Sequence, residues 1–299
     1  DHNIGFGYAT GEKMTSGEHN ILMGYFAGGK ITDATENVII GKSAGFEVTS
    51  SSHNVYIGDS SGQYRQGGGR NIAIGKDVLK GSSTAANNTG YYNIAFGVLA
   101  GASVTSGGYN IFFGRNTGDA VTTGSGNIAM GCHALGGNVS GAHNVVLGAT
   151  AGQSIGGACN VFIGRAAGES SGTAADNDAS DNVAIGHDAG KGLTDGDDNV
   201  AVGHGAGNSI TTGCYNVALG KDALRDSSTG CWNIAIGPWA GRANTTQCHA
   251  IYIGSRAGCD RTTGDDNIGI GRQALQAAVG SGTGGQNVAI GMLAGECIS

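Results

Sequence analysis

The sequence predicts an all-β fold, a parallel β-solenoid (β-roll) of about 17 coils with a 17-residue repeat. The first observation is a five-residue motif, Asn-Ile-Ala-Ile-Gly at 233–237, which recurs along the whole chain. Twelve of the sixteen spacings between copies are 17 residues, and the others are 16, 20, 22 and 22. The second observation is that Val or Ile follows the first position of every copy and Gly ends every copy. A repeat this short and regular is typical of coils that stack on one another.

The first position of the motif predicts a column of side-chain amides. Parallel stacking in register places identical residues about 4.8 Å apart, so that each amide can bond to the amides of the coils on either side. The predicted ladder contains Asn20, Asn37, Asn54, Asn71, Asn110, Asn127, Asn199, Asn216 and Asn233. Ala250 is the one copy in which this position is not Asn.

The second and fourth positions of the motif are apolar in every copy, and we predict that they point into the coil, because residues two apart share a face of a strand. The middle residue is then predicted to point outward. It is never charged, and an uncharged outward stripe is costly to leave in water, which predicts a surface covered by another copy of the chain. The alternative is that small Ala residues are neutral filler on a thin coil. The predicted self-association face comprises Tyr56, Ala73, Phe112, Phe162, Ala201, Ala218, Ala235 and Tyr252.

The remainder of each repeat predicts a corner and a second strand. The Gly that ends the motif should turn the chain where a side chain would not fit, and a small residue such as Ala27 or Ala100 follows it. The inward residues of the expected second strand are Met14, Ile31, Val48, Val104, Val121, Ile155, Leu193 and Ile210. Three inserts, 80–90, 169–181 and 276–286, fall after the corner and should bulge from one side.

Composition limits the classes of function. The chain of 299 residues has 59 Gly and 1 Pro, only 13% charged residues and a net charge of -7. This argues against a broad nucleic-acid-binding surface, and no apolar run approaches the roughly 20 residues that span a bilayer. The unbroken repeat predicts one solenoid domain over 1–299, with no nucleic-acid partner and no insertion into a membrane.

Cys214, Cys231 and Cys248 occupy the same position in three successive copies, which predicts a vertical column of sulfur atoms. The coil spacing lies within the Cα range of a disulfide. One pair could therefore close, leaving the third thiol free or paired with Cys259, or all three could be free thiols. Zinc is less favoured, because stacking in line gives no tetrahedral convergence.

Few residues suggest chemistry. Asp181 and Asp198 stack, with Asp197 beside them, and they are weak calcium candidates, because carboxylates at that spacing repel unless they are solvated or bridged by a cation. A solvated surface is the preferred interpretation. No catalytic residue, cofactor site or other metal site is predicted, since neither a Ser-His-Asp arrangement nor a glycosidase carboxylate pair stands out.

The motif Asn-Val-Ala-Ile-Gly-x-x-Ala, at 182–189 and 287–294, resembles the head repeat of trimeric autotransporter adhesins. It is also similar to Asn-x-Ala-Ile-Gly repeats in phage tail fibres. The resemblance covers nearly the whole chain, although adhesin repeats are usually a few residues shorter and the stalk, membrane anchor and chaperone domain of those proteins have no counterpart here. It implies a left-handed parallel β-roll that assembles as a trimer and serves attachment.

These observations predict a non-enzymatic extracellular protein on a cell or virion surface, a structural or adhesive fibre. Its expected partners are copies of itself, as a homotrimer or a head-to-tail filament, and a cell-surface glycan or protein receptor. One alternative is ice binding through rows of Thr, interrupted by Arg65, Lys80 and the inserts. The other is a carbohydrate-active enzyme on a β-helix. The Thr rows contain Thr15, Thr32, Thr49, Thr105, Thr122, Thr194 and Thr211.

Overall fold

The computed structural model describes residues 2–84, 87–172, 177–277 and 283–296. These residues form three-residue β-strands joined by turns, with no α-helix among them, and hence no helix in the described part that could cross a membrane. The predicted all-β parallel solenoid is confirmed. The chain divides into two compact units, residues 1–144 and 145–299, and each is described by itself.

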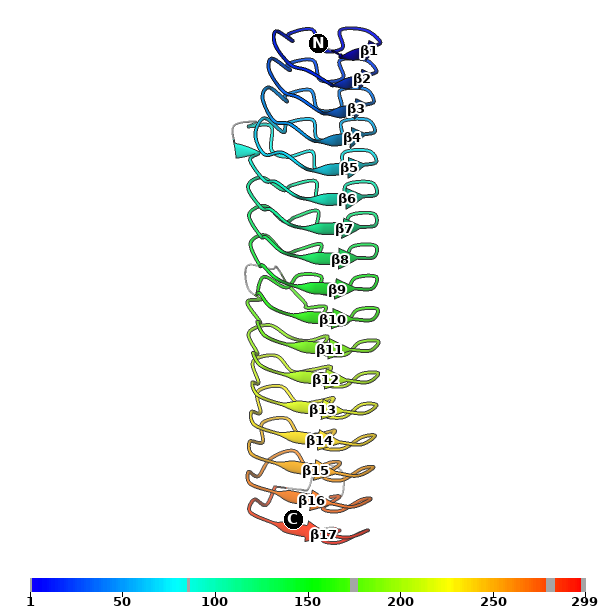
Figure 1. The fold of residues 1–299 in the computed structure, drawn as a ribbon. Helices are drawn as coiled ribbons and strands as arrows, with labels where there is room; N and C mark the ends of the chain where they lie inside the picture. Colours follow the sequence, from blue (N-terminus) through cyan, green and yellow to red (C-terminus); the bar gives the residue numbers. More distant parts are fainter. Residues whose placement is uncertain (1, 85–86, 173–176, 278–282, 297–299) are drawn as a thin grey trace. The chain divides into compact units, whose positions relative to one another are not determined.

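The first unit contains eight parallel strands, each bonded in register to the next copy of the repeat (Figure 1). They are β1 (Ile4–Phe6), β2 (Ile21–Met23), β3 (Val38–Ile40), β4 (Val55–Ile57), β5 (Ile72–Ile74), β6 (Ile94–Phe96), β7 (Ile111–Phe113) and β8 (Ile128–Met130).

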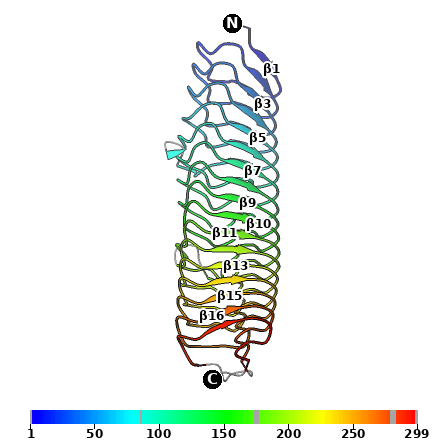
Figure 2. The same cartoon turned by 60° about the horizontal axis from the view of Figure 1, so that its bottom comes forward.

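The second unit contains nine strands in the same parallel order. Figure 2 shows from another side how the strands of successive coils follow one another within each unit. They are β9 (Val145–Leu147), β10 (Val161–Ile163), β11 (Val183–Ile185), β12 (Val200–Val202), β13 (Val217–Leu219), β14 (Ile234–Ile236), β15 (Ile251–Ile253), β16 (Ile268–Ile270) and β17 (Val288–Ile290).

The middle residue of each strand points into the coil, opposite to the sequence prediction. Ile39 and Ala95 are fully buried, whereas the first and third residues of their strands are partly exposed. The buried Asn just before each strand sets this phase, because side chains alternate between faces. The predicted outward self-association face is therefore wrong, since its members are 0–3% exposed within a single chain: Tyr56, Ala73, Phe112, Phe162, Ala201, Ala218, Ala235 and Tyr252.

The buried residues at the middle strand position differ in size from coil to coil, and neighbouring glycines make room for the large ones. A large ring at the middle strand position lies against the glycine six residues later. A Cβ on Gly118 would come within 2.4 Å of the Phe112 ring, and a Cβ on Gly258 within 2.3 Å of the Tyr252 ring. Ala27 and Ala100, predicted to be small inward residues at the corner, are fully buried.

The predicted corner glycine is confirmed, but the predicted second strand is wrong. Gly24 has a φ of 134°, and a Cβ there would lie 2.6 Å from the carbonyl oxygen of Gly41 in the next coil. The following segment is a series of turns, not a strand. Its apolar side chains still point inward as predicted, except Met14, which is partly exposed; the buried ones are Ile31, Val48, Val104, Val121, Ile155, Leu193 and Ile210.

Candidate functional site

The predicted asparagine ladder is confirmed in both units. In the first unit, from Asn3 to Asn144, the backbone N–H of each Asn donates to Oδ1 of the preceding one at 2.9–3.1 Å. Its Nδ2 donates to the same oxygen at 3.0–3.3 Å. In the second unit the ladder runs from Asn160 to Asn233 and connects Asn267 to Asn287. Apart from the end members Asn3 and Asn287, the ladder amides are buried with their bonds made, so the ladder is structural.

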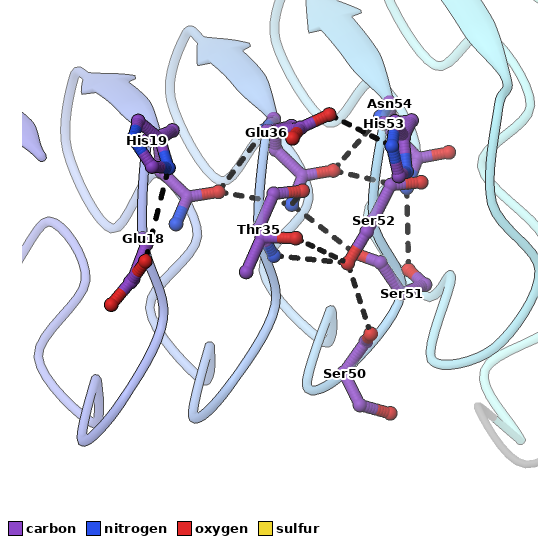
Figure 3. A network of polar contacts seen from close by, with 11 residues as sticks. Glu18, His19, Thr35, Glu36, Ser50, Ser51, Ser52, His53 and Asn54 are labelled. Carbon is purple, nitrogen blue, oxygen red and sulfur yellow. Dashed lines mark hydrogen bonds and ion pairs between the residues drawn. The ribbon is translucent and has the colours of Figure 1, made fainter. Parts of the chain in front are cut away.

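A second ladder lies two residues before each Asn, and sequence analysis missed it. We call it the capping column: a side chain at this position accepts a hydrogen bond from the backbone N–H of the same position in the preceding coil. Thr35 N–H donates to Ser52 Oγ at 2.9 Å (Figure 3), and Gly108 N–H donates to Ser125 Oγ at 3.1 Å. The signal in the sequence was that several copies carry Ser, Asp or Cys at this position, each of which can accept a hydrogen bond.

The three stacked cysteines belong to this capping column. Cys214 N–H donates to Cys231 Sγ at 3.1 Å, and Cys231 N–H donates to Cys248 Sγ at 3.2 Å. Asp197 precedes the run and Asp265 follows it in the same column. All three cysteines are free thiols in this structure. Burial raises the pKa of the Cys231 thiol, and the neighbouring thiols raise it further, while the N–H of Cys214 opposes the shift.

Cys259, expected as a fourth partner, is a free thiol that is only 4% exposed. Burial raises the pKa of its thiol to about 12. It lines a pocket of about 290 Å³ with Trp239, Arg242, Arg256 and other residues. The structure therefore shows no pairing of Cys259 with the column.

The calcium candidates do not converge. Asp181 and Asp198 stand immediately before ladder residues, whereas Asp197 is in the capping column and its Oδ1 accepts the N–H of Ser180 at 2.8 Å. The carboxylate of Asp198 raises the pKa of the Tyr215 hydroxyl. Within the described residues, no three His, Cys, Asp or Glu side chains are grouped to hold a metal ion.

The side-chain hydroxyls of the Thr rows donate hydrogen bonds to backbone carbonyl groups of the next coil. Thr15 Oγ1 donates to the carbonyl of Thr32 at 3.1 Å, and Thr105 Oγ1 donates to that of Thr122 at 3.1 Å. The same bond is made by Thr32, Thr122, Thr194 and Thr211. The sequence analysis expected Arg65 to interrupt the Thr rows, but Arg65 does not lie in them. It takes the buried position of Ile31 and Val48 instead.

Arg65 is a buried cation inside the first unit. It is 0% exposed, and Nη1 donates to the carbonyls of Val104 and Thr105 at 3.3 and 3.1 Å. Among the described residues, no carboxylate forms an ion pair with Arg65, and its Nε and Nη2 have no hydrogen-bond partner. Burial lowers its pKa, and Tyr56 opposes this shift. Arg261 takes the equivalent place beside Tyr252 in the second unit. Each of the two arginines is followed by a coil with an insert.

Because two tyrosines are buried, we expect the protein to lose stability at alkaline pH. Burial raises the pKa of Tyr56 and of Tyr252 to about 12, and Arg65 and Arg261 oppose these shifts. Because the folded pKa exceeds the usual value of about 10, their stabilising contribution is complete below pH 10. It is lost as the pH rises towards 12, on the order of 2–3 kcal/mol for each tyrosine.

Tyrosinate absorbance should therefore show the two buried tyrosines titrating late, together with the loss of circular dichroism. Tyr252→Phe should remove one late-titrating group. If all tyrosines titrate together near pH 10 while the fold remains intact, the burial argument is wrong.

Two surfaces of the coil carry exposed side chains in register. One is the aliphatic face, which consists of the first and third residues of every strand. Ile128 is 37% and Met130 45% exposed, and the rings of Phe96 and Phe113 stack at 4.8 Å. Every member of this face is Ile, Val, Leu, Met or Phe, so it carries no charge in either unit.

The other surface is the exposed column, formed by the residue immediately before each ladder position. In the first unit, Tyr92 and Tyr109 stack at 5.1 Å, and Arg70 lies 5.5 Å from the Tyr92 ring. In the second unit, Tyr215 stacks on Trp232 at 4.1 Å. Ion pairs also connect members of this column, such as Glu36 and His53 at 2.8 Å (Figure 3).

A pocket beside the coils of the second unit has a volume of about 450 Å³. An ion pair of Glu169 with Lys191, at 3.6 Å, lies at this pocket. Ser and Gly residues form most of its remaining wall, with no histidine or cysteine among the lining residues. Glu169, Ser170 and Ser171, at the start of the second insert, form part of its lining.

No protein-family model, curated protein or solved structure matches this chain.

Proposed function

We propose that the protein is a non-enzymatic structural and adhesive fibre protein that associates with copies of itself through the aliphatic face. The observation that supports the proposal is this uncharged, half-exposed face, which continues through every strand of a unit. Eight coils stacked about 4.8 Å apart, with two side-chain columns per strand, make a patch on the order of 400–500 Å². That is within the range of the largest apolar patch on a typical monomer, which is often a functional surface.

A second copy is the occupant that best matches the chemistry of this face. It is flat and uncharged, whereas a receptor that binds transiently usually meets a mixed surface with polar groups. The face is also identical in kind from coil to coil, so two copies can pack over many coils without a special register. The resemblance to adhesin heads favours three copies around one axis.

The adhesive part of the proposal rests on the exposed column. Its backbone is constant, since each residue precedes a ladder Asn, but its side chains vary among aromatic, basic and acidic types. The stacked rings of Tyr215 and Trp232 cover each other's faces, so a ligand would meet ring edges and the neighbouring Asp198. A cell-surface glycan or protein receptor, on the outside of a cell or virion, is the partner that we propose for this column.

The test of self-association is to place charge on the aliphatic face without changing the net charge. Ile94→Lys with Ile111→Glu puts an opposite-charge pair on adjacent strands, where it should preserve the fold. Ser106→Lys with Thr123→Glu is the matched control at two exposed stacked positions. In sedimentation equilibrium, we expect the wild type and the control to be oligomers, with trimers as the proposed state, and the face variant to be a monomer.

A wild-type protein that is monomeric at every concentration would overturn self-association. A face variant that assembles like the wild type would show that copies meet through another surface. Circular dichroism of both variants distinguishes loss of assembly from loss of the fold.

A further inference from the structure

The sulfur atoms of Cys214, Cys231 and Cys248 lie in line along the second unit. Each sulfur accepts the N–H of the residue one coil earlier, at 3.4, 3.1 and 3.2 Å in order. Each one therefore occupies the same place relative to its own coil. Because neighbouring parallel strands lie about 4.7–4.9 Å apart, successive sulfur atoms repeat at about that distance.

This spacing matches a metal bound between two thiolates better than it matches a disulfide. A metal–thiolate bond is about 2.3 Å long, so a linear sulfur–metal–sulfur unit spans about 4.6 Å. A disulfide needs the two sulfurs about 2.05 Å apart. Closing that gap would draw at least one sulfur away from the N–H that it accepts, whereas a linear metal leaves both sulfurs in place.

We propose that neighbouring thiols of this run bind a soft monovalent d10 cation, of the Cu(I) and Ag(I) class, in linear two-coordinate geometry. Thiolate sulfur is the ligand that selects such ions. One ion fits between Cys214 and Cys231 and another between Cys231 and Cys248, so the sulfur of Cys231 is shared when both are bound. For each isolated site, two S–H bonds break, two metal–sulfur bonds form, two protons leave to solvent, and no oxidation occurs.

The surroundings of the three sulfurs suit this role. All three cysteines are partly exposed, so a cation can reach them. The N–H groups of Asp197, Cys214 and Cys231 already point at the sulfurs and would stabilise the negative charge of the bis-thiolate unit. Two ligands suffice for a linear ion, so the site needs no cluster of three.

The hydrogen bond to the backbone N–H in the capping column does not require a sulfur acceptor. The same column uses Ser52, Ser125 and Ser180 to accept the equivalent N–H elsewhere in the chain. A Cys→Ser variant therefore keeps the cap and removes only the metal ligand, which separates the proposed site from the structural role of the column.

The experiment is Ag(I) binding in excess reduced glutathione, followed by desalting and native mass spectrometry of the whole chain. The glutathione removes silver held by single thiols, while two aligned thiolates retain it. We expect one or two silver ions per wild-type chain and none in Cys231→Ser, whose remaining column sulfurs lie about 9.6 Å apart, two coil spacings. Cys214→Ser and Cys248→Ser should each retain one ion, and Cys132→Ser, at an exposed position, should bind as the wild type does.

X-ray absorption of the silver-loaded chain should show two sulfur neighbours and no others. Circular dichroism and Tm of the serine variants should match those of the wild type, which establishes that lost silver means lost ligands. Wild-type protein that retains no silver, or Cys231→Ser that retains as much as the wild type, would overturn the proposal.

Discussion

Replacing Asn216 by alanine is expected to lower the free energy of unfolding by about 3–5 kcal/mol, because several buried groups lose their partners together. Oδ1 of Asn216 accepts both the backbone N–H and the Nδ2 of Asn233, each at 3.0 Å. Its Nδ2 donates to Asn199 Oδ1 at 3.0 Å and to the carbonyl of Gly230 at 2.7 Å. No water can replace these bonds without entering the filled interior.

The matched control is Thr212→Ala, an exposed position in the same coil, which should change stability by less than about 0.5 kcal/mol. Because stacked repeats can unfold in parts, urea denaturation should be accompanied by hydrogen exchange at the amides of β13 and β14. Faster exchange confined to these coils is the expected pattern. A variant as stable as the control would mean that the ladder contributes little.

The inward or outward direction of the strand side chains shows how much of the fold could be predicted from the sequence. The period, the coil and the asparagine ladder all follow from a repeat in which Asn recurs at fixed spacing. The inward and outward faces were exchanged because Val and Ile at the second and fourth positions were expected to be buried. A buried Asn20 and the alternation of side chains together require Leu22 to be inside, so the ladder itself contained the correct phase.

The filling of the interior explains why the residues at the middle strand position vary so much in size. Ala129 and Phe112 occupy equivalent places in adjacent coils and are both fully buried. A surface position would tolerate such variation without compensation, whereas Phe112 is accommodated by Gly118 in its own coil. Compensation of this kind depends on three-dimensional neighbours, and a single sequence does not reveal which residues provide it.

Other features could not be read from the repeat. Arg65 looked like a surface residue because a buried guanidinium without a carboxylate is costly. Its burial and its bonds to the carbonyls of Val104 and Thr105, two coils further along the chain, are seen only in the structure. The capping column was readable in principle, since Ser52, Ser125 and Asp197 share one offset from the ladder. It was missed because Ser, Asp and Cys were considered separately and not as hydrogen-bond acceptors.

The coil that begins at Ala250 provides the second large effect, because a side chain other than Asn forms hydrogen bonds inside it. Ala250 interrupts the ladder, and its N–H still donates to Asn233 Oδ1 at 3.0 Å. Gln247, three residues earlier and fully buried, stands where most coils have a small residue. Its Nε2 donates to the carbonyl of Thr263 at 2.6 Å. Thr263 is next to Gly264, whose carbonyl an Asn at 250 would reach, by analogy with the bond from Asn233 to the carbonyl of Gln247.

Gln247 and Asn at 250 cannot share this space. In the preceding coil, a Cβ on Gly230, the equivalent of position 247, would lie 3.0 Å from Nδ2 of Asn233. Ala250→Asn alone should therefore overpack the interior and destabilise the chain by about 2–3 kcal/mol. Gln247→Gly alone should cost about 2–4 kcal/mol, because it leaves a cavity and removes the acceptor of the Tyr252 hydroxyl, now bonded at 2.9 Å.

The double variant should be more stable than the sum of the two single changes predicts, by about 1–3 kcal/mol, because each substitution removes the conflict that the other creates. It restores the Gly and Asn of the other coils and lets the amide at 250 bond to those of Asn233 and Asn267. Urea denaturation of the four proteins in this cycle measures the coupling, with Gln247→Gly and Thr212→Ala combined as the uncoupled control. Additive effects would mean that Gln247 and the ladder position are independent, and that the amide of Gln247 does not substitute for the missing Asn.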